Sequence, residues 1–453
     1  MNIFTSFGLS VATAFVAISA QAAPDIDPSL ARILNSPQES NRSMTVIVTY
    51  KNPPQRREQF SSRGAYQRGL MRTADLSQAQ SLKLLQNQRR EARIVYKRFW
   101  LGNSMAVTAP ASVIRQLVQD EQIASVRPNR IYRLVRPAQE APPSAEKFTY
   151  GLTKIRLPEL QQKTQGTLDG RGVRVGILDT GIDASHPDLK GRTILFKDFI
   201  SGRTTPYDDN NHGTHVAGTI AGGNHSGTAI GVAPGAQLIV GKIFSASGSA
   251  NEDDILSAMQ WMADPDGNPD TNDAPRLVSN SWGGGRASGD PANEPNCKAV
   301  DAWVKLGILP VFAAGNEGPS AKTVGLPAAC PLALAVGATD ENDNIARFSS
   351  RGPVVWSNIT LIKPEISAPG ARVLSSVPGG DYKSYSGTSM ATPHVAGLAA
   401  LMFQANPQAR SETIAQKLMQ GATDLGPAGQ DNDSGWGRID AMNSLQFLLN
   451  RAL

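Results

Sequence analysis

The feature that most constrains the fold of this chain is an alternation of short apolar runs with helical patterns after residue 146. The apolar runs have strand length and are rich in aliphatic and β-branched residues. Such runs suit strands that are buried on both faces, and their alternation with helices predicts a parallel sheet covered by helices on both sides. We expect strands at 173–178, 237–242, 277–281, 308–313 and 332–336, and helices at 215–221, 253–262, 298–305 and 390–403.

The first third of the chain follows a different pattern. We expect a strand at 44–50, a helix at 73–93, extended segments over 92–108, a short helix at 111–119 and a strand at 123–134. This order is typical of a small α+β domain. Residues 137–145 read Pro-Ala-Gln-Glu-Ala-Pro-Pro-Ser-Ala, which indicates a linker between two domains.

The charge of the chain is divided between these two parts. Residues 24–140 carry 19 Lys/Arg against 9 Asp/Glu, whereas residues 141–453 carry 25 against 30. A nucleic-acid-binding protein needs a basic surface on its working domain, so the acidic larger part argues against nucleic acid as a partner. Two parts of opposite charge are instead expected to dock on each other.

Residues 1–22 have the pattern of a secretory signal peptide. An apolar run spans 3–20, and Ala20-Gln21-Ala22 offers small residues for cleavage. The alternative is a membrane anchor, but the run is short and contains polar residues. We expect a protein that is secreted, to the extracellular space or a periplasm, without stable membrane association.

The chain contains two cysteines, Cys297 and Cys330. In an exported protein a pair of cysteines favours a disulfide bond, and two free thiols are the alternative.

Four polar residues stand where predicted strands end or helices begin. Asp179 ends the first predicted strand of the larger part, and His212 opens the helical segment His-Gly-Thr-His-Val-Ala-Gly. Asn316 follows another strand, and Ser389 opens a helix whose interior contains Pro393. A serine hydroxyl becomes a nucleophile when an imidazole accepts its proton and a carboxylate orients that imidazole. An amide and a helix N-terminus suit the oxyanion that forms next.

These segments resemble those of the subtilisin-like serine proteases (subtilases, peptidase family S8), in the same order along the chain. The matching blocks are Asp-Thr-Gly from Asp179, the His212 segment, Ala-Gly-Asn-Glu-Gly around Asn316, and Gly-Thr-Ser-Met-Ala around Ser389. The resemblance covers about residues 150–441. It implies an α/β fold with a subtilisin-like parallel sheet, and endopeptidase activity. In this activity Asp179 orients the His212 imidazole, and His212 transfers protons. Ser389 attacks the carbonyl carbon of the peptide bond, and Asn316 stabilises the oxyanion.

The resemblance also implies a groove for extended protein or peptide substrates. By analogy with the family, two edge segments bind the substrate backbone, and small residues line the pocket for the side chain before the cut. These walls favour large apolar side chains. The expected substrate-binding residues are Lys242, Ile243, Phe244, Ser281, Trp282, Gly283, Ala313, Ala314 and Gly315.

No cofactor is expected for catalysis, but two places have the composition of a structural Ca²⁺ site. In the family, the residue at the position of Asp188 often binds calcium, although His225 stands here where an Asn ligand is usual. The second is the loop 264–273, in which Asp264, Asp266 and Asp270 alternate with a turn glycine. The alternative for this loop is a solvated acidic turn.

Subtilases commonly carry an inhibitory propeptide of ferredoxin-like β-α-β-β-α-β order, which assists folding and is then cut off. Residues 23–140 have matching size and order, so the expected organisation is a signal peptide (1–22), a propeptide (23–140) and a catalytic domain (141–453) of a monomeric zymogen that processes itself near the linker. The alternatives are a permanent accessory domain, a non-catalytic binding protein on the same scaffold, and a transpeptidase that uses the same acyl-enzyme.

Overall fold

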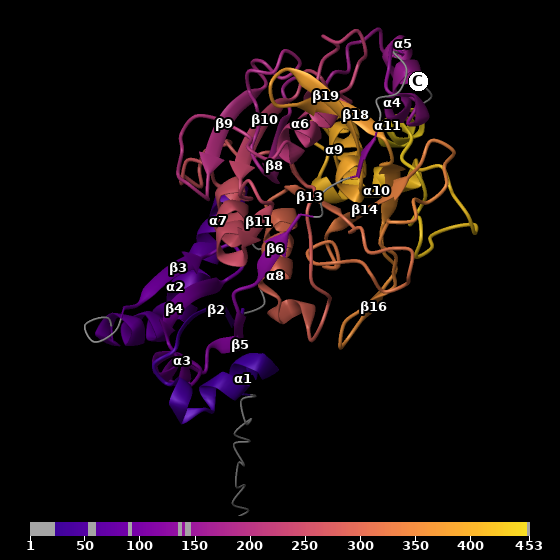
Figure 1. Ribbon diagram of the computed structural model, residues 1–453. Coiled ribbons are helices and arrows are strands. Elements are labelled where there is room, and N and C mark those ends of the chain that lie inside the picture. Colours follow the sequence, from indigo (N-terminus) through magenta and orange to yellow (C-terminus); the bar gives the residue numbers. More distant parts are fainter. Residues whose placement is uncertain (1–22, 53–59, 89–92, 135–137, 141–145, 451–453) are drawn as a thin grey trace, which may run out of the picture.

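The computed structural model describes residues 23–52, 60–88, 93–134, 138–140 and 146–450 (Figure 1). The predicted signal peptide and most of the predicted linker lie outside these ranges. The described chain forms two units: an N-terminal α+β unit and a larger α/β unit that carries the candidate catalytic residues. No helix in the described ranges is both long and apolar enough to cross a bilayer.

A seven-stranded sheet forms the centre of the larger unit. All of its strand pairs are parallel, as the alternation of apolar runs and helices predicts. The two outermost strands, β9 and β17, were not predicted, and β9 leaves Ile194 and Leu195 exposed. The order across the sheet is β17 (Ile366–Pro369), β14 (Leu334–Thr339), β13 (Leu309–Ala313), β12 (Leu277–Asn280), β8 (Arg174–Asp179), β10 (Gln237–Lys242) and β9 (Thr193–Asp198).

Helices cover both faces of this sheet, each over its own apolar cluster. One cluster contains Val175 and Ile177 of β8, together with side chains of α6 (His212–Ala221), α9 (Thr388–Ala405), α10 (Ser411–Gln420) and α11 (Ala441–Leu449). The other contains Leu178 of the same strand with side chains of α7 (Glu252–Ala263) and α8 (Pro295–Lys305). Successive side chains of a strand point to opposite faces, so strands buried on both sides become continuously apolar. The predicted architecture is confirmed.

The N-terminal unit is a five-stranded sheet in the order β1 (Asp25–Ile26), β5 (Ile123–Pro128), β2 (Ser43–Tyr50), β4 (Ser104–Pro110) and β3 (Val95–Phe99). Its helices include α1 (Pro28–Leu34), α2 (Arg63–Gln88) and α3 (Ala111–Leu117). The succession β2-α2-β3-β4-α3-β5 has the ferredoxin-like order expected from the family resemblance. Helix α2 begins ten residues before its predicted start at residue 73.

The sheet of the N-terminal unit is buried on both faces because it docks on the larger unit. Val46 and Val48 of β2 belong to the internal core of the N-terminal unit. Ile47, between them, belongs instead to the cluster that contains α7 and α8. Figure 1 shows the indigo and violet N-terminal unit beside α7 and α8.

The predicted strand 123–134 is wrong in one respect, because it breaks after β5. Residues Ile131–Arg133 form a separate strand, β6, that pairs antiparallel with β11 (Ser249–Asn251) of the larger unit. Further along, β7 (Ala138–Glu140) pairs antiparallel with β19 (Asp381–Ser386), which completes a small sheet with β18 (Val373–Val377). The end of the N-terminal unit therefore adds strands to the larger unit at two places.

Candidate active site

The structure brings Asp179 and His212 together at the carboxyl edge of the sheet. Asp179 is the last residue of β8, and His212 is the first residue of α6. His212 Nδ1 donates to Asp179 Oδ1 at 2.7 Å, and the backbone N–H of Thr180 donates to the same oxygen at 2.8 Å. Burial alone would lower the pKa of His212, but the attraction of Asp179 outweighs it and raises this pKa above its ordinary 6.5. The carboxylate therefore fixes the tautomer that leaves Nε2 able to accept a proton.

Ser389 lies in the first turn of α9, which packs against α6. Its hydroxyl donates to the Ser281 carbonyl at 2.8 Å, and the Ser281 hydroxyl donates back to the Ser389 carbonyl at 2.9 Å. The second bond has a local cause: Pro393 has no N–H to donate to the carbonyl four residues earlier, which is that of Ser389.

In this state the Ser389 hydroxyl is directed to Ser281, and His212 Nε2 has no hydrogen-bond partner among the described residues. Proton transfer therefore requires the Ser389 side chain to rotate from Ser281 toward the imidazole. Catalytic hydrogen bonds are often looser before substrate binds, so this geometry is compatible with a serine nucleophile.

The amide of Asn316 is oriented by the residue before the serine. Its Oδ1 accepts from both the backbone N–H and the hydroxyl of Thr388, each at 2.9 Å. Because these donors fix the oxygen, the NH₂ group is left on the other side, where a Cβ built on Gly387 would lie 3.4 Å from Nδ2. The positive φ of Gly315, 115°, turns the chain into this position directly after β13. An amide donor beside Ser389 suits an oxyanion.

Three backbone segments of small residues meet near Ser389. The N–H of Gly325 donates to the Ala314 carbonyl at 3.1 Å, and that of Gly284 donates to the Leu326 carbonyl at 2.8 Å. The segment with Ala313, Ala314 and Gly315 thus lies close to the segment that follows Ser281. A Cβ on Gly283 would approach the Leu326 carbonyl oxygen to 3.0 Å, so a larger residue there would crowd these segments.

Trp282 and Phe244 lie in an aromatic cluster that includes a side chain of the N-terminal unit. The Tyr132 ring of β6 lies edge-on to Trp282 with centroids 5.7 Å apart, and Trp282 in turn lies 6.1 Å from Phe244. Ile243 is buried in the same apolar cluster. Ile243, Phe244 and Trp282 therefore lie where a peptide that pairs with β11 in the same way as β6 would place one of its side chains.

Lys242 requires a correction. It was expected to bind substrate, but its side chain is fully buried and Nζ donates to the carbonyls of Thr180 at 2.6 Å and Phe244 at 2.9 Å. Nζ also forms an ion pair with Asp209 at 2.6 Å. The edge that accepts an added strand is β11, which begins at Ser249, rather than the segment Lys242, Ile243 and Phe244.

At both expected metal sites, the partners of the acidic side chains differ from the prediction. Both carboxylate oxygens of Asp188 accept hydrogen bonds at 2.7 Å, one from the His225 N–H and one from the Tyr382 hydroxyl. In the loop 264–273, the acidic cluster contains Asp273 instead of Asp270; Asp270 forms an ion pair with Arg68 at 2.7 Å.

Oxygens of Asp264, Asp266 and Asp273 lie within 4.8 Å of one another. One buried oxygen each of Asp264 and Asp273 lacks a partner among the described residues. Three carboxylates in one loop, two of which leave an oxygen without a partner, fit the requirements of Ca²⁺.

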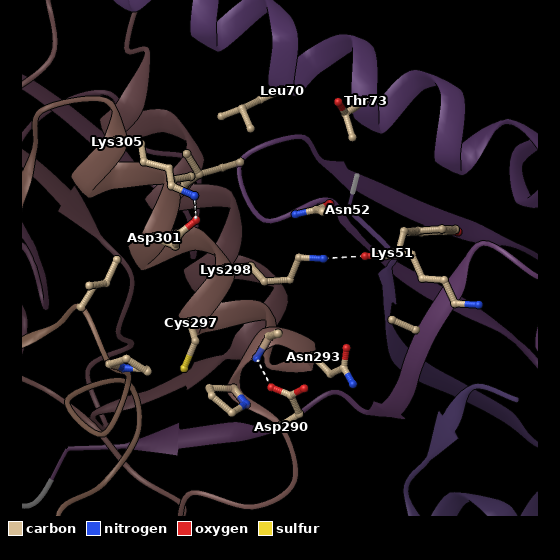
Figure 2. A pocket seen from close by; sticks show the side chains of 18 of the residues that line it. Lys51, Asn52, Leu70, Thr73, Asp290, Asn293, Cys297, Lys298, Asp301 and Lys305 are labelled. Carbon is tan, nitrogen blue, oxygen red and sulfur yellow. Dashed lines mark hydrogen bonds and ion pairs between the residues drawn. The ribbon is translucent and has the colours of Figure 1, made fainter. Parts of the chain in front are cut away.

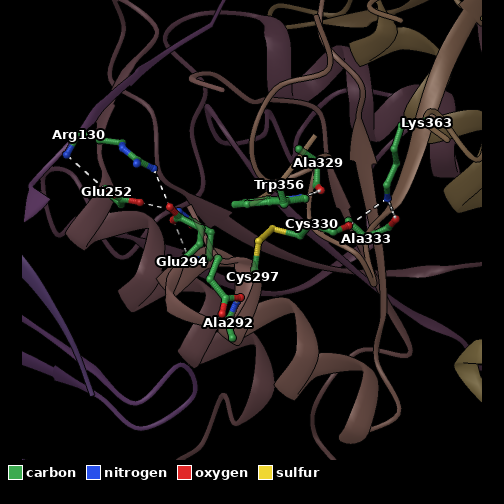
Figure 3. Close-up of a disulfide and its surroundings, with 12 residues drawn as sticks. Arg130, Glu252, Ala292, Glu294, Cys297, Ala329, Cys330, Ala333, Trp356 and Lys363 are labelled. Carbon is green, nitrogen blue, oxygen red and sulfur yellow. Dashed lines mark hydrogen bonds and ion pairs between the residues drawn. A yellow bond between two sulfur atoms is a disulfide. The ribbon is translucent and has the colours of Figure 1, made fainter. Parts of the chain in front are cut away.

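Cys297 and Cys330 form a disulfide bond that ties α8 to the segment between β13 and β14 (Figure 3). Of the two alternatives left open by the sequence, free thiols are therefore wrong for the described chain.

A cavity of about 800 Å³ lies away from the candidate site, between the N-terminal unit and α8 (Figure 2). Lys298 lines it and donates to the Tyr50 carbonyl, and burial lowers the pKa of Lys298 to about 7. This cavity is a feature of the contact between the units.

Sequence comparisons identify the larger unit. A family model described as the subtilase family matches residues 170–437. The chain belongs to the subtilase family. Its catalytic unit is therefore that of a subtilisin-like serine-type peptidase, whose catalysis needs no cofactor, and the resemblance noted in the sequence is confirmed.

Similar proteins include bacillopeptidase F of Bacillus subtilis (strain 168), which is 34% identical over 450 residues, covering 91% of this chain and 30% of that protein. Subtilisin E from the same organism is 37% identical over 336 residues, covering 73% of this chain and 78% of that protein. Serine protease AprX, also from Bacillus subtilis (strain 168), is 39% identical over 304 residues, covering 62% of this chain and 67% of that protein. The chain thus spans less than a third of the length of bacillopeptidase F.

Proposed function

We propose that this chain is an endopeptidase that hydrolyses peptide bonds in proteins through an acyl-enzyme on Ser389. The observation that carries the proposal is the buried Asp179–His212 hydrogen bond beside the helix whose first turn contains Ser389. His212 accepts the hydroxyl proton as Ser389 attacks the substrate carbonyl, and returns it to the leaving amine. A water activated by His212 then hydrolyses the ester.

The oxyanion of each tetrahedral intermediate accepts hydrogen bonds from Asn316 Nδ2 and from the backbone N–H of Ser389. The amide orientation imposed by Thr388 supports the first of these roles. The position of Ser389 in the first turn of α9 supports the second, because N–H groups at a helix start are free to donate.

We further propose that the N-terminal unit, expected over residues 23–140, is a propeptide that inhibits the enzyme and is cut off by Ser389 a few residues before that expected boundary. Two contacts support this role. Leu134, directly after β6, donates its N–H to the Gly248 carbonyl at 2.8 Å, and Ala138 of β7 pairs with Ser386, three residues before Ser389. A chain bound on both sides of the nucleophile occupies the groove as a substrate would, so the expected cut lies between Leu134 and Ala138.

The remaining properties follow from this assignment. The small walls at Ala313–Gly315 favour large apolar residues before the cut. Export after removal of residues 1–22 is proposed from the pattern of that segment, and the mature enzyme is proposed to act as a monomer.

We propose a structural Ca²⁺ held by Asp264, Asp266 and Asp273. Calcium should raise the melting temperature of the full-length Ser389→Ala chain, and Asp266→Asn should abolish that rise while Asp270→Asn keeps it.

A maturation experiment tests the central proposal. The full-length chain should yield two fragments with a new N-terminus between residues 135 and 138, and a fluorophosphonate should then label Ser389. Ser389→Ala should stay uncut, whereas Ser320→Ala, an exposed serine outside the site, should mature normally. Cutting of the Ser389→Ala chain in a protease-free host would refute self-processing.

The same products separate the alternatives. An uncut wild-type chain whose Ser389 can be labelled indicates a permanent accessory domain. If the N-terminal unit is removed by another protease and Ser389 is still not labelled, the larger unit is a non-catalytic scaffold. Amide products with an added amine indicate transpeptidation.

A further inference from the structure

Two glutamates of the larger unit meet at the starts of α7 and α8. Glu252 is the first residue of α7 and is fully buried, and Glu294 is the N-cap of α8 and is 6% exposed. Asn296 Nδ2 donates to one oxygen of each, which holds the two carboxylates side by side. Figure 3 shows Glu252 and Glu294 with Arg130 directed toward them.

This pair is occupied by two arginines of the N-terminal unit. Arg127 donates to both oxygens of Glu252, with Nη2 2.6 Å from Oε1, and the same nitrogen lies 2.8 Å from Glu294 Oε1. Arg130 Nη1 donates to the other oxygen of Glu294 at 3.0 Å. Burial alone would raise the pKa of Glu294, but the two guanidinium groups outweigh it and lower this pKa. The Glu294 carboxylate is thus held in its charged form, and a buried charge requires a cation as a partner.

The pair lies in line with the strand that occupies the groove. The backbone N–H of Glu252 donates to the Arg130 carbonyl at 2.9 Å, which extends the pairing of β6 with β11 by one residue. Two residues further on, the Tyr132 ring packs edge-on against Trp282. A protein substrate that adds to β11 as β6 does would therefore place one side chain against Glu294.

We propose that Glu252 and Glu294 form a binding site for an arginine side chain of protein substrates, at the position that Arg130 takes directly before β6. The inference rests on the proposed peptidase function and deepens it. Arg127 belongs to β5 and leaves with the N-terminal unit, so both carboxylates become available to the substrate. Arginine suits the site better than lysine because its planar fork donates to two carboxylates at once.

Peptide kinetics on the matured enzyme test this site. An internally quenched peptide with the sequence of residues 129–140 is compared with a copy in which citrulline, neutral and of the same shape, replaces Arg130. We expect citrulline to raise KM about tenfold, or roughly 1.4 kcal/mol, with kcat unchanged. The matched control places citrulline at Arg133, whose guanidinium makes one solvent-exposed hydrogen bond, to the Ser249 hydroxyl, in the described structure. This change should alter KM less than about twofold.

Enzyme variants assign the effect to the pair. Glu294→Gln and Glu252→Gln should remove the preference for arginine over citrulline, and Asp301→Asn, on the same helix α8, should retain it. If the glutamine variants fail to mature, the wild-type enzyme still decides: KM of the arginine peptide should rise with salt, and KM of the citrulline peptide should not.

Equal kcat/KM for the arginine and citrulline peptides would overturn the inference, as would a preference that survives both glutamine substitutions. Failure of the proposed function looks different, because no peptide is then cleaved and Ser389 is not labelled.

Discussion

Arg127 provides the most direct test of how the two units are held together. Its side chain is 9% exposed and compensates two carboxylates that the larger unit buries. Arg127→Met keeps much of the apolar stem but removes the charge. Glu252 then retains no cation among the described side chains, whereas Glu294 keeps Arg130.

The size of the effect follows from burial. Removing one partner of a buried ion pair costs about 3–5 kcal/mol, because the other charge stays desolvated and unpaired. We expect the lower limit, about 3 kcal/mol, since opening of the interface lets water reach Glu252. Lys97 is the contrasting case: it pairs with Asp253 and Asp254 but is 43% exposed, so Lys97→Met should cost at most about 1 kcal/mol.

Amide hydrogen exchange on the full-length Ser389→Ala chain measures this difference. Amides of the central strands β2 and β4 report opening of the N-terminal unit while the larger unit stays folded. A loss of about 3 kcal/mol corresponds to exchange faster by roughly 150-fold, against at most about fivefold for Lys97→Met. Adding Glu252→Met to Arg127→Met should restore most of the protection, because an apolar pair of similar volume needs no counter-charge.

The reasoning is refuted if Arg127→Met accelerates exchange no more than Lys97→Met. It also fails if the double variant is as labile as Arg127→Met alone, since lost packing would then explain the effect.

Three further predictions concern the site and the core. Asn316→Ala should lower kcat by about 10²–10³ with little change in KM, measured by steady-state kinetics; a change confined to KM would exclude the oxyanion role. Because neutral His212 is the active form and its pKa is raised, kcat/KM should fall as pH drops through a value above 6.5. An acid limb below pH 6 would contradict the influence of the carboxylate. Replacing Cys297 and Cys330 by alanine should reduce the free energy of unfolding by roughly 3–4 kcal/mol, given their separation of 33 residues, and unchanged denaturation by urea would contradict this.

The apolar pattern was sufficient to predict the inner strands of the large sheet but not its edges. Inner strands are buried on both faces and read as continuous apolar runs, whereas β9 has an exposed face and a mixed sequence. The split of charge predicted that the two parts dock. It did not indicate which side chains meet, since Arg127 and Glu252 are separated by 125 residues. The sequence also did not show that β6 would separate from the predicted strand 123–134, because its pairing partner, β11, lies in the other unit.

Residues that go against local structural preferences show which features of the site could be predicted from the sequence and which could not. Pro393 inside an apolar helix marked the Ser389 segment as unusual, and the structure supplies the missing half: the carbonyl that Pro393 leaves unpaired accepts from Ser281, 108 residues away. Thr388 is a second case, because it fixes the orientation of Asn316 across 72 residues. An exception can be read from the sequence because it violates a local preference. The partner that compensates for it cannot be read from the sequence. That partner depends on the fold, which brings the ends of separate strands to one edge of the sheet.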